Sequence, residues 1–275
     1  MKTMYSGIGQ NNKKSQLFGA FSAGILLLSA GLLHAQTTPG LINVDFNGNS
    51  IGTAYGGGGA ATGPTQTGAA LIGSAGDSWN GIADSQLTFS SYPGGVSASG
   101  LALSYANGSA SGVTMSLTGD GTYDANEPNW GNTSAFTTAG SPYSNLMQDL
   151  IYANSARAVT LSGLAANQTF DLVLYNAGDQ NVGGGRTSTF TVNGVTQTSI
   201  WNGTTSTLIA GQTYVEYASA TSDGTGTLVI TYGTGTGETD LDGFQLLAVP
   251  EPSTWAMLGA GSLMLLGYRR TFRRA

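Results

Sequence analysis

The chain has 275 residues, 43 of them Gly, with 9% charged residues and no Cys. Without Cys it can form no disulfide, thiolate metal site or Cys nucleophile. Residues 36–249 carry two cationic side chains, Arg157 and Arg186, against fourteen acidic ones, and this net charge of −12 argues against nucleic acid and anionic lipid headgroups as partners of the domain.

The N-terminal segment has the features of an export signal. Lys13 and Lys14 precede an apolar run over residues 17–33, which ends at the cleavage-like tripeptide Leu33-His34-Ala35. We predict that residues 1–35 are a secretory signal peptide with a helical apolar core; an uncleaved anchor is the alternative. Cleavage would remove the only His of the chain, so the exported domain would have no imidazole for a catalytic triad or a zinc site.

Residues 36–248 are predicted to form one all-β domain, an antiparallel β-sandwich. Alternating or β-branched runs separated by turn residues occupy residues 41–46, 113–117, 159–162, 170–175, 213–219, 227–232 and 244–249. The dipeptide Asn193-Gly194 between residues 187–192 and 195–200 predicts a hairpin with a type I′ turn. Residues 145–152 depart from this pattern, because their apolar side chains recur at helical spacing and predict one short helix or turn.

The first and last predicted strands resemble those of jelly-roll sandwiches of the galactose-binding or carbohydrate-binding-module kind. The resemblance rests on Asn43-Val44-Asp45-Phe46 near the start and Asp242-Gly243-Phe244-Gln245-Leu246 near the end. It implies that the terminal strands lie side by side and that Asp45 lies near Asp240 and Asp242.

Two acidic loops are candidate Ca²⁺ sites, because clustered side-chain oxygens are the ligands that Ca²⁺ prefers. The first contains Asp120, Asp124, Asn126 and Glu127, and the second contains Glu238, Asp240 and Asp242. Solvated turns are the alternative for both loops, since Asp and Asn often cap turns. Arg157 and Arg186 are each expected to pair with a carboxylate; binding of an acidic sugar by one of them is the alternative.

Sugar recognition commonly uses an aromatic ring beside polar groups, which makes Trp79, Asn80, Trp130 and Trp201 the candidate ligand-binding residues. Packing in the core is the alternative for each Trp. Many carboxylates also leave a glycosidase open, although no pair stands out.

The C-terminal segment has three parts in a fixed order: Pro250-Glu251-Pro252, a mostly apolar stretch over residues 254–268, and a basic cluster of Arg269, Arg270, Arg273 and Arg274. The apolar stretch is shorter than the roughly 20 residues of a typical membrane-spanning helix, but its arginines can extend to the cytoplasmic interface. A buried core helix is the alternative.

This order resembles the PEP-CTERM sorting signal, over residues 249–275. The resemblance implies recognition by an exosortase, a membrane transpeptidase, with an inner-membrane-anchored intermediate and then release to the cell surface or extracellular matrix. We therefore expect an exported, non-catalytic surface or matrix protein. A carbohydrate-binding module for exopolysaccharide is the alternative, and a carboxylate-dependent glycosidase is the third interpretation.

Overall fold

The computed structural model describes residues 38, 40–48, 64–90, 95–124, 134–178, 186–235 and 237–249. The chain divides into two compact units, Met1–His34 and Ala35–Ala275, and every described residue belongs to the second. The predicted signal-peptide helix and C-terminal helix lie outside the described residues. Within the described part, no helix is both long and apolar enough to cross a membrane.

The described residues are almost entirely strands and loops, which confirms the all-β prediction. Helical structure in this part is confined to the 3₁₀ turn Asp84–Gln86 and the single turn α1 (Ala135–Thr138). In chain order the strands are β1 (Leu41–Asn47), β2 (Asn80–Ala83), β3 (Thr88–Phe89), β4 (Val96–Ser104), β5 (Ala110–Gly119), β6 (Gly121–Asp124), β7 (Asp149–Ala153), β8 (Arg157–Ser162), β9 (Thr169–Tyr175), β10 (Arg186–Val192), β11 (Val195–Trp201), β12 (Tyr214–Thr221), β13 (Leu228–Tyr232), β14 (Thr239–Leu241) and β15 (Gly243–Ala248).

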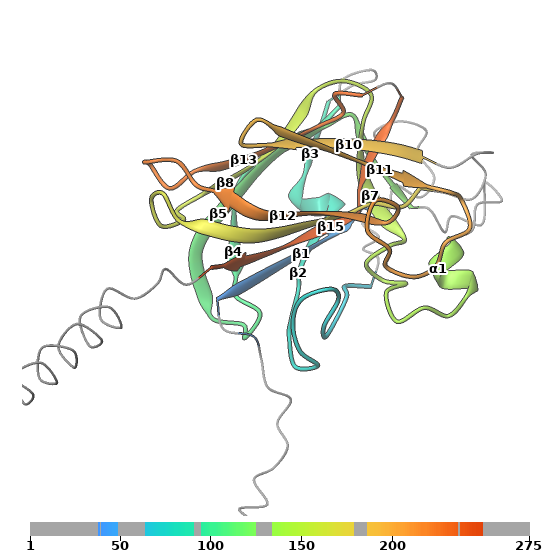
Figure 1. Cartoon of the computed structure of the whole chain (residues 1–275), viewed down its shortest axis with the longest axis horizontal. Coiled ribbons are helices and arrows are strands. Elements are labelled where there is room, and N and C mark those ends of the chain that lie inside the picture. The colour runs from blue at the N-terminus through green and yellow to red at the C-terminus, as the bar shows by residue number, and fades with distance from the viewer. Residues whose placement is uncertain are drawn as a thin grey trace, which may run out of the picture. The chain divides into compact units, whose positions relative to one another are not determined.

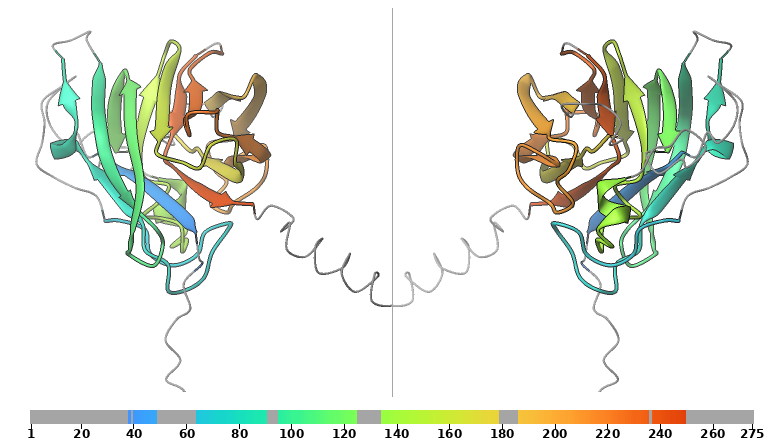
Figure 2. Two further views of the ribbon diagram at one scale, coloured as in Figure 1. Left: turned by 90° about the vertical axis from the view of Figure 1, so that its left-hand side faces the viewer. Right: turned by 90° about the vertical axis from the view of Figure 1, so that its right-hand side faces the viewer.

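These strands form two large sheets and one small one. The five-stranded sheet has the order β12-β9-β15-β1-β2, the seven-stranded sheet has the order β11-β10-β13-β8-β5-β4-β3, and the three-stranded sheet has the order β14-β7-β6. All the pairings are antiparallel except β1 with β2. Figure 1 shows β1 and β15 side by side, and Figure 2 shows β4, β5, β8 and β13 of the seven-stranded sheet in succession from green to orange.

The main hydrophobic core lies between the two large sheets. It combines Ile42, Val44 and Phe46 of β1 with inward residues of the seven-stranded sheet such as Met115 and Ile230, all at most 2% exposed. Alternate residues of β1 therefore point to one face of its sheet, as strand geometry requires. Burial of these apolar side chains is the principal favourable term for the sandwich.

The outer face of the five-stranded sheet is also buried, although alternating strand sequences are typical of sheets with one solvated face. Residues 64–79 cover it through polar contacts: Asn43 Nδ2 donates to Ser78 O at 3.0 Å, and Gln245 accepts from Ile72 N–H at 2.9 Å and donates to Ile72 O at 2.7 Å. A second hydrophobic cluster packs on this face. Its core members are Trp79, Ala135, Phe136, Leu146, Met147, Val173, Tyr175, Ala177 and Trp201.

The predicted hairpin at Asn193-Gly194 is confirmed. Strands β10 and β11 pair from Arg186 opposite Trp201 to Val192 opposite Val195, and the two turn residues have φ values of 50° and 77°. Positive φ at both positions is what a type I′ turn needs.

Strands that follow one another in the chain do not always pair. The strands β8 and β9 belong to different sheets, as do β12 and β13, so each of these connections crosses from one sheet to the other. Of the short helix or turn expected over residues 145–152, the structure has a turn up to residue 148, and strand β7 takes the place of the rest. Leu150 and Ile151 are both buried because β7 is covered on both faces, and such two-sided burial resembles helical spacing in the sequence.

Candidate functional site

Four aspartates are buried where the five-stranded and three-stranded sheets adjoin. Asp45 is on β1, Asp84 follows β2, Asp149 begins β7, and Asp242 lies between β14 and β15; their exposed fractions are 0%, 2%, 1% and 0%. Buried carboxylates are rare unless they are paired or bound to a metal. We call these four residues the buried acidic cluster.

The ladder between β1 and β15 brings two members of the cluster together. Asp45 lies opposite Gly243, and the Phe46 N–H donates to Asp242 O at 2.9 Å. The implied proximity of Asp45 to Asp242 is therefore correct. The pairing works because the residue opposite Asp45 is Gly243, whose lack of a side chain leaves room there.

Main-chain groups hold one oxygen of each of these two carboxylates. Asp45 Oδ2 accepts a hydrogen bond from Gln66 N–H at 2.7 Å, and Asp242 Oδ2 accepts one from Ala177 N–H. Asp149 Oδ2 receives a longer bond from Gln148 Nε2, at 3.4 Å. Among the described residues, Oδ1 of Asp45, Asp149 and Asp242 has no hydrogen-bond partner.

Burial and mutual repulsion raise the pKa values of the cluster. Burial, together with the charges of Asp124, Asp45 and Asp84, raises the pKa of Asp149 to about 9. Burial also raises the pKa of Asp242, helped by Asp240, Asp45 and Asp149, and it raises the pKa of Asp45. The pKa of Asp84 rises to about 6 through burial, against a bond from the Thr122 hydroxyl.

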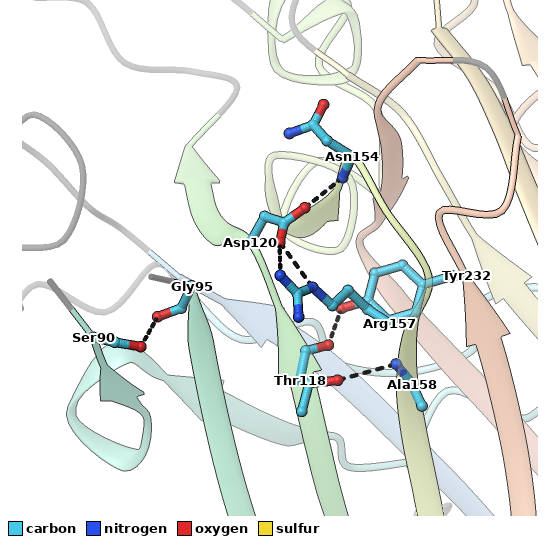
Figure 3. A network of polar contacts seen from close by, with 8 residues as sticks. All are labelled: Ser90, Gly95, Thr118, Asp120, Asn154, Arg157, Ala158 and Tyr232. Atoms are coloured by element: carbon cyan, nitrogen blue, oxygen red, sulfur yellow. Dashed lines mark hydrogen bonds and ion pairs between the residues drawn. The ribbon is translucent and has the colours of Figure 1, made fainter. Parts of the chain in front are cut away.

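The two arginines of the domain bind other acids, which confirms that each pairs with a carboxylate. Figure 3 shows Arg157 on Asp120, whose other oxygen accepts from Asn154 N–H at 2.6 Å. Arg186 lies 2.9 Å from Glu238 and 3.4 Å from Asp240. Since residues 36–249 contain no other Lys or Arg, no cationic side chain of the domain is left for the buried acidic cluster.

The residues of the two predicted Ca²⁺ loops do not stay together as two separate groups. In the first loop, Asp120 is bound to Arg157, and Asp124 on β6 lies opposite Asp149 on β7. Asn126 and Glu127 lie outside the described residues. In the second, Glu238 and Asp240 contact Arg186, and Asp242 joins the buried acidic cluster. Asp84 and Asp149 were missed, because no local motif marks them; only strand pairing brings them near Asp45.

The described members of the predicted sugar site serve structural roles. Trp79 is 9% exposed and Trp201 is 0% exposed; their Nε1 atoms donate to Gly68 O at 2.8 Å and Thr205 O at 3.0 Å. Asn80 Nδ2 donates to Asn43 O and Ser104 O, and its Oδ1 accepts from Ser104 N–H. These side chains are thus committed to packing and strand linkage, and Trp130 lies outside the described residues.

The raised pKa values predict how the stability of the metal-free protein depends on pH. An unfolded Asp titrates near pH 3.9, so between pH ~4 and the folded pKa the native state binds more protons than the unfolded state. The protonated aspartates therefore stabilise the native state relative to the unfolded state. This contribution is fully present below the unfolded pKa, and it is lost as pH rises through about 6 for Asp84 and about 9 for Asp149. We expect the Tm in chelator to fall steadily from pH 5 to pH 9, and the slope to be smaller in Asp149→Asn; a flat or rising profile would contradict this.

The described fold defines the class of protein as an all-β sandwich with several antiparallel sheets. Residues 248–274 match the PEP-CTERM protein-sorting motif, which implies that the protein is exported and processed by an exosortase. No curated protein and no solved structure matches the chain. The likeness to galactose-binding domains accordingly stays a prediction.

Proposed function

We propose that the protein is a non-catalytic component of the cell surface or extracellular matrix, displayed there after exosortase processing. The sorting motif at residues 248–274 is the observation that carries this proposal. The buried acidic cluster supports a structural role, because carboxylates that are at most 2% exposed are shielded from any polymeric substrate.

A second candidate function is binding of a neutral exopolysaccharide, favoured by the outer face of the seven-stranded sheet. There Thr196, Thr191 and Thr231 lie in register on β11, β10 and β13, and Thr160 lies opposite Ser116 on β8 and β5. All five residues are exposed or half-buried. This hydroxyl face, defined by these five uncharged residues, offers donors and acceptors to sugar hydroxyls without the repulsion of the acidic surface.

The sorting proposal is tested by changing Pro250, Glu251 and Pro252 together to Ala in the native host. We expect the wild-type protein to lose its C-terminal segment and reach the surface fraction, while the triple variant keeps its full C-terminal mass in the inner membrane. Intact mass and fractionation measure both. A matched control replaces three exposed residues with Ala: Ser219 on β12, and Asp223 and Thr225 in the loop that follows. Surface display of the triple variant would contradict the proposal.

The polysaccharide candidate predicts that Thr196→Lys and Thr231→Lys weaken retention on a column of the host's neutral exopolysaccharide at least tenfold, because bulky charges interrupt the hydroxyl face. Ser219→Lys on β12 is the control and should leave retention unchanged. Failure of the wild-type protein to bind would end this candidate and leave the sorting proposal standing.

A further inference from the structure

The buried acidic cluster has no cationic side chain of the domain to neutralise its carboxylates. Asp45 lies near enough to Asp149 and Asp242 for its charge to raise the pKa of both. The strands hold these residues together: β1 pairs with β15 beside Asp242, and β1 contacts β7, which begins at Asp149. Carboxylates so placed must either take up protons or receive a cation from outside the chain.

Each of three carboxylates in the cluster has one buried oxygen without a hydrogen-bond partner among the described residues. Asp45 and Asp242 are each held by a main-chain N–H at Oδ2, which fixes the position of the carboxylate. Oδ1 of Asp45, Asp149 and Asp242 is fully buried and has no hydrogen-bond partner in the described part of the chain. A buried acceptor without a partner costs free energy comparable to a lost hydrogen bond, so three together point to a bound group.

We propose that Asp45, Asp149 and Asp242 bind a divalent cation of the Ca²⁺ type through their Oδ1 atoms. Ca²⁺ takes carboxylate and carbonyl oxygens and water in flexible arrangements of six to eight ligands, so carboxylates contributed by three different strands or strand ends can serve it. The ion would tie β1, β7 and the β14–β15 junction together, and it would neutralise charges that neither arginine reaches.

Loading the ion requires a local adjustment of the side chains. Across the described residues, no three acidic, His or Cys side chains already form a group that could hold a metal. In the proposed site the carboxylates of Asp45 and Asp242 would turn about Oδ2, which a main-chain N–H holds, so that Oδ1 reaches the ion. Backbone carbonyls and water would complete its coordination, as they do in most Ca²⁺ sites.

The alternative explanation is that the carboxylates of the cluster are protonated and bind no ion. The pH dependence of the Tm distinguishes ion binding from protonation. Metal binding requires deprotonated carboxylates, so the stabilisation by Ca²⁺ must grow as pH rises. Proton uptake alone predicts a Tm that falls with pH whether or not Ca²⁺ is present.

The test uses the protein purified from its host, stripped with EDTA and dialysed into buffer at pH 8. We expect CaCl₂ to raise the Tm by about 5–10 °C when free Ca²⁺ is about 100-fold above its Kd, and the shift to be smaller at pH 5. Equilibrium dialysis with Ca²⁺ should find one ion per chain. An unchanged Tm together with no bound ion would overturn the proposal.

Two variants locate the ion. Asp45→Asn and Asp242→Asn keep the size of the side chain and an acceptor oxygen, so they should fold in EDTA while losing the bound ion and most of the Tm shift. Glu216→Gln, which removes an exposed charge on β12, is the matched control and should keep both. An equal loss in Glu216→Gln would show diffuse binding to the acidic surface, and retention of one ion in Asp45→Asn would place it elsewhere; either result overturns the proposal.

Discussion

Replacing Gly243 with Ala should destabilise the domain by about 3 kcal/mol, which corresponds to a fall in Tm of about 6–12 °C for a domain of this size. Gly243 lies in the middle of the five-stranded sheet, opposite Asp45 on one side and Tyr175 on the other. A Cβ at this position would collide with Val44 O and lie 2.8 Å from Leu146 Cδ1, closer than the 3.0 Å that real Cβ atoms respect. The backbone oxygen belongs to a fully paired central strand and cannot move without breaking the ladder.

Gly224→Ala is the matched control for this prediction. A Cβ there would meet nothing within 4 Å, and Gly224 does not have a left-handed φ. Its substitution should change the free energy of unfolding by less than about 0.5 kcal/mol. Chemical denaturation of both variants measures the difference. Equal stabilities would mean that β1 and β15 do not pack as closely as their register implies.

The strands could be predicted from local sequence, and their partners could not. Alternating apolar residues and the Asn193-Gly194 turn are encoded within a few residues of each other, so β10 and β11 were predicted together with their turn. The partners of β8, β9, β12 and β13 depend on which sheet each strand joins. That choice minimises exposed apolar area over the whole domain and leaves no local signal.

The buried acidic cluster illustrates the same limit. Asp242 and Asp45 were both singled out from sequence, because the first and last strands of such sandwiches are often neighbours. Asp84 lies 39 residues from Asp45 and 158 from Asp242, and Asp149 lies 104 residues from Asp45 and 93 from Asp242. Neither residue belongs to a segment with an acidic motif. Only the pairing of β6 with β7, and the burial of β7 beside β1, reveals that Asp149 belongs with them.

Trp201 shows how burial on the second face of a sheet changes the interpretation of an aromatic residue. Alternation along β11 places Trp201 and Ser199 inward and Ile200 outward, at 0%, 0% and 58% exposure. The second hydrophobic cluster that encloses Trp201 is formed by segments far apart in the sequence, including Trp79, Phe136 and Met147. A Trp beside Asn202 and Gly203 therefore has the local appearance of a loop aromatic, although it is part of a core.

Truncation of Trp201 should therefore lower the stability of the domain, and it should not act by removing a sugar-binding surface. We expect Trp201→Ala to cost about 4 kcal/mol, since it removes a large buried ring and leaves a cavity, while Ile200→Ala on the exposed side of the same strand should cost less than about 0.5 kcal/mol. Urea denaturation of both variants measures the two costs. A Trp201→Ala variant with wild-type stability that had lost affinity for polysaccharide would instead make Trp201 a ligand platform, which its buried ring and its bond to Thr205 O argue against.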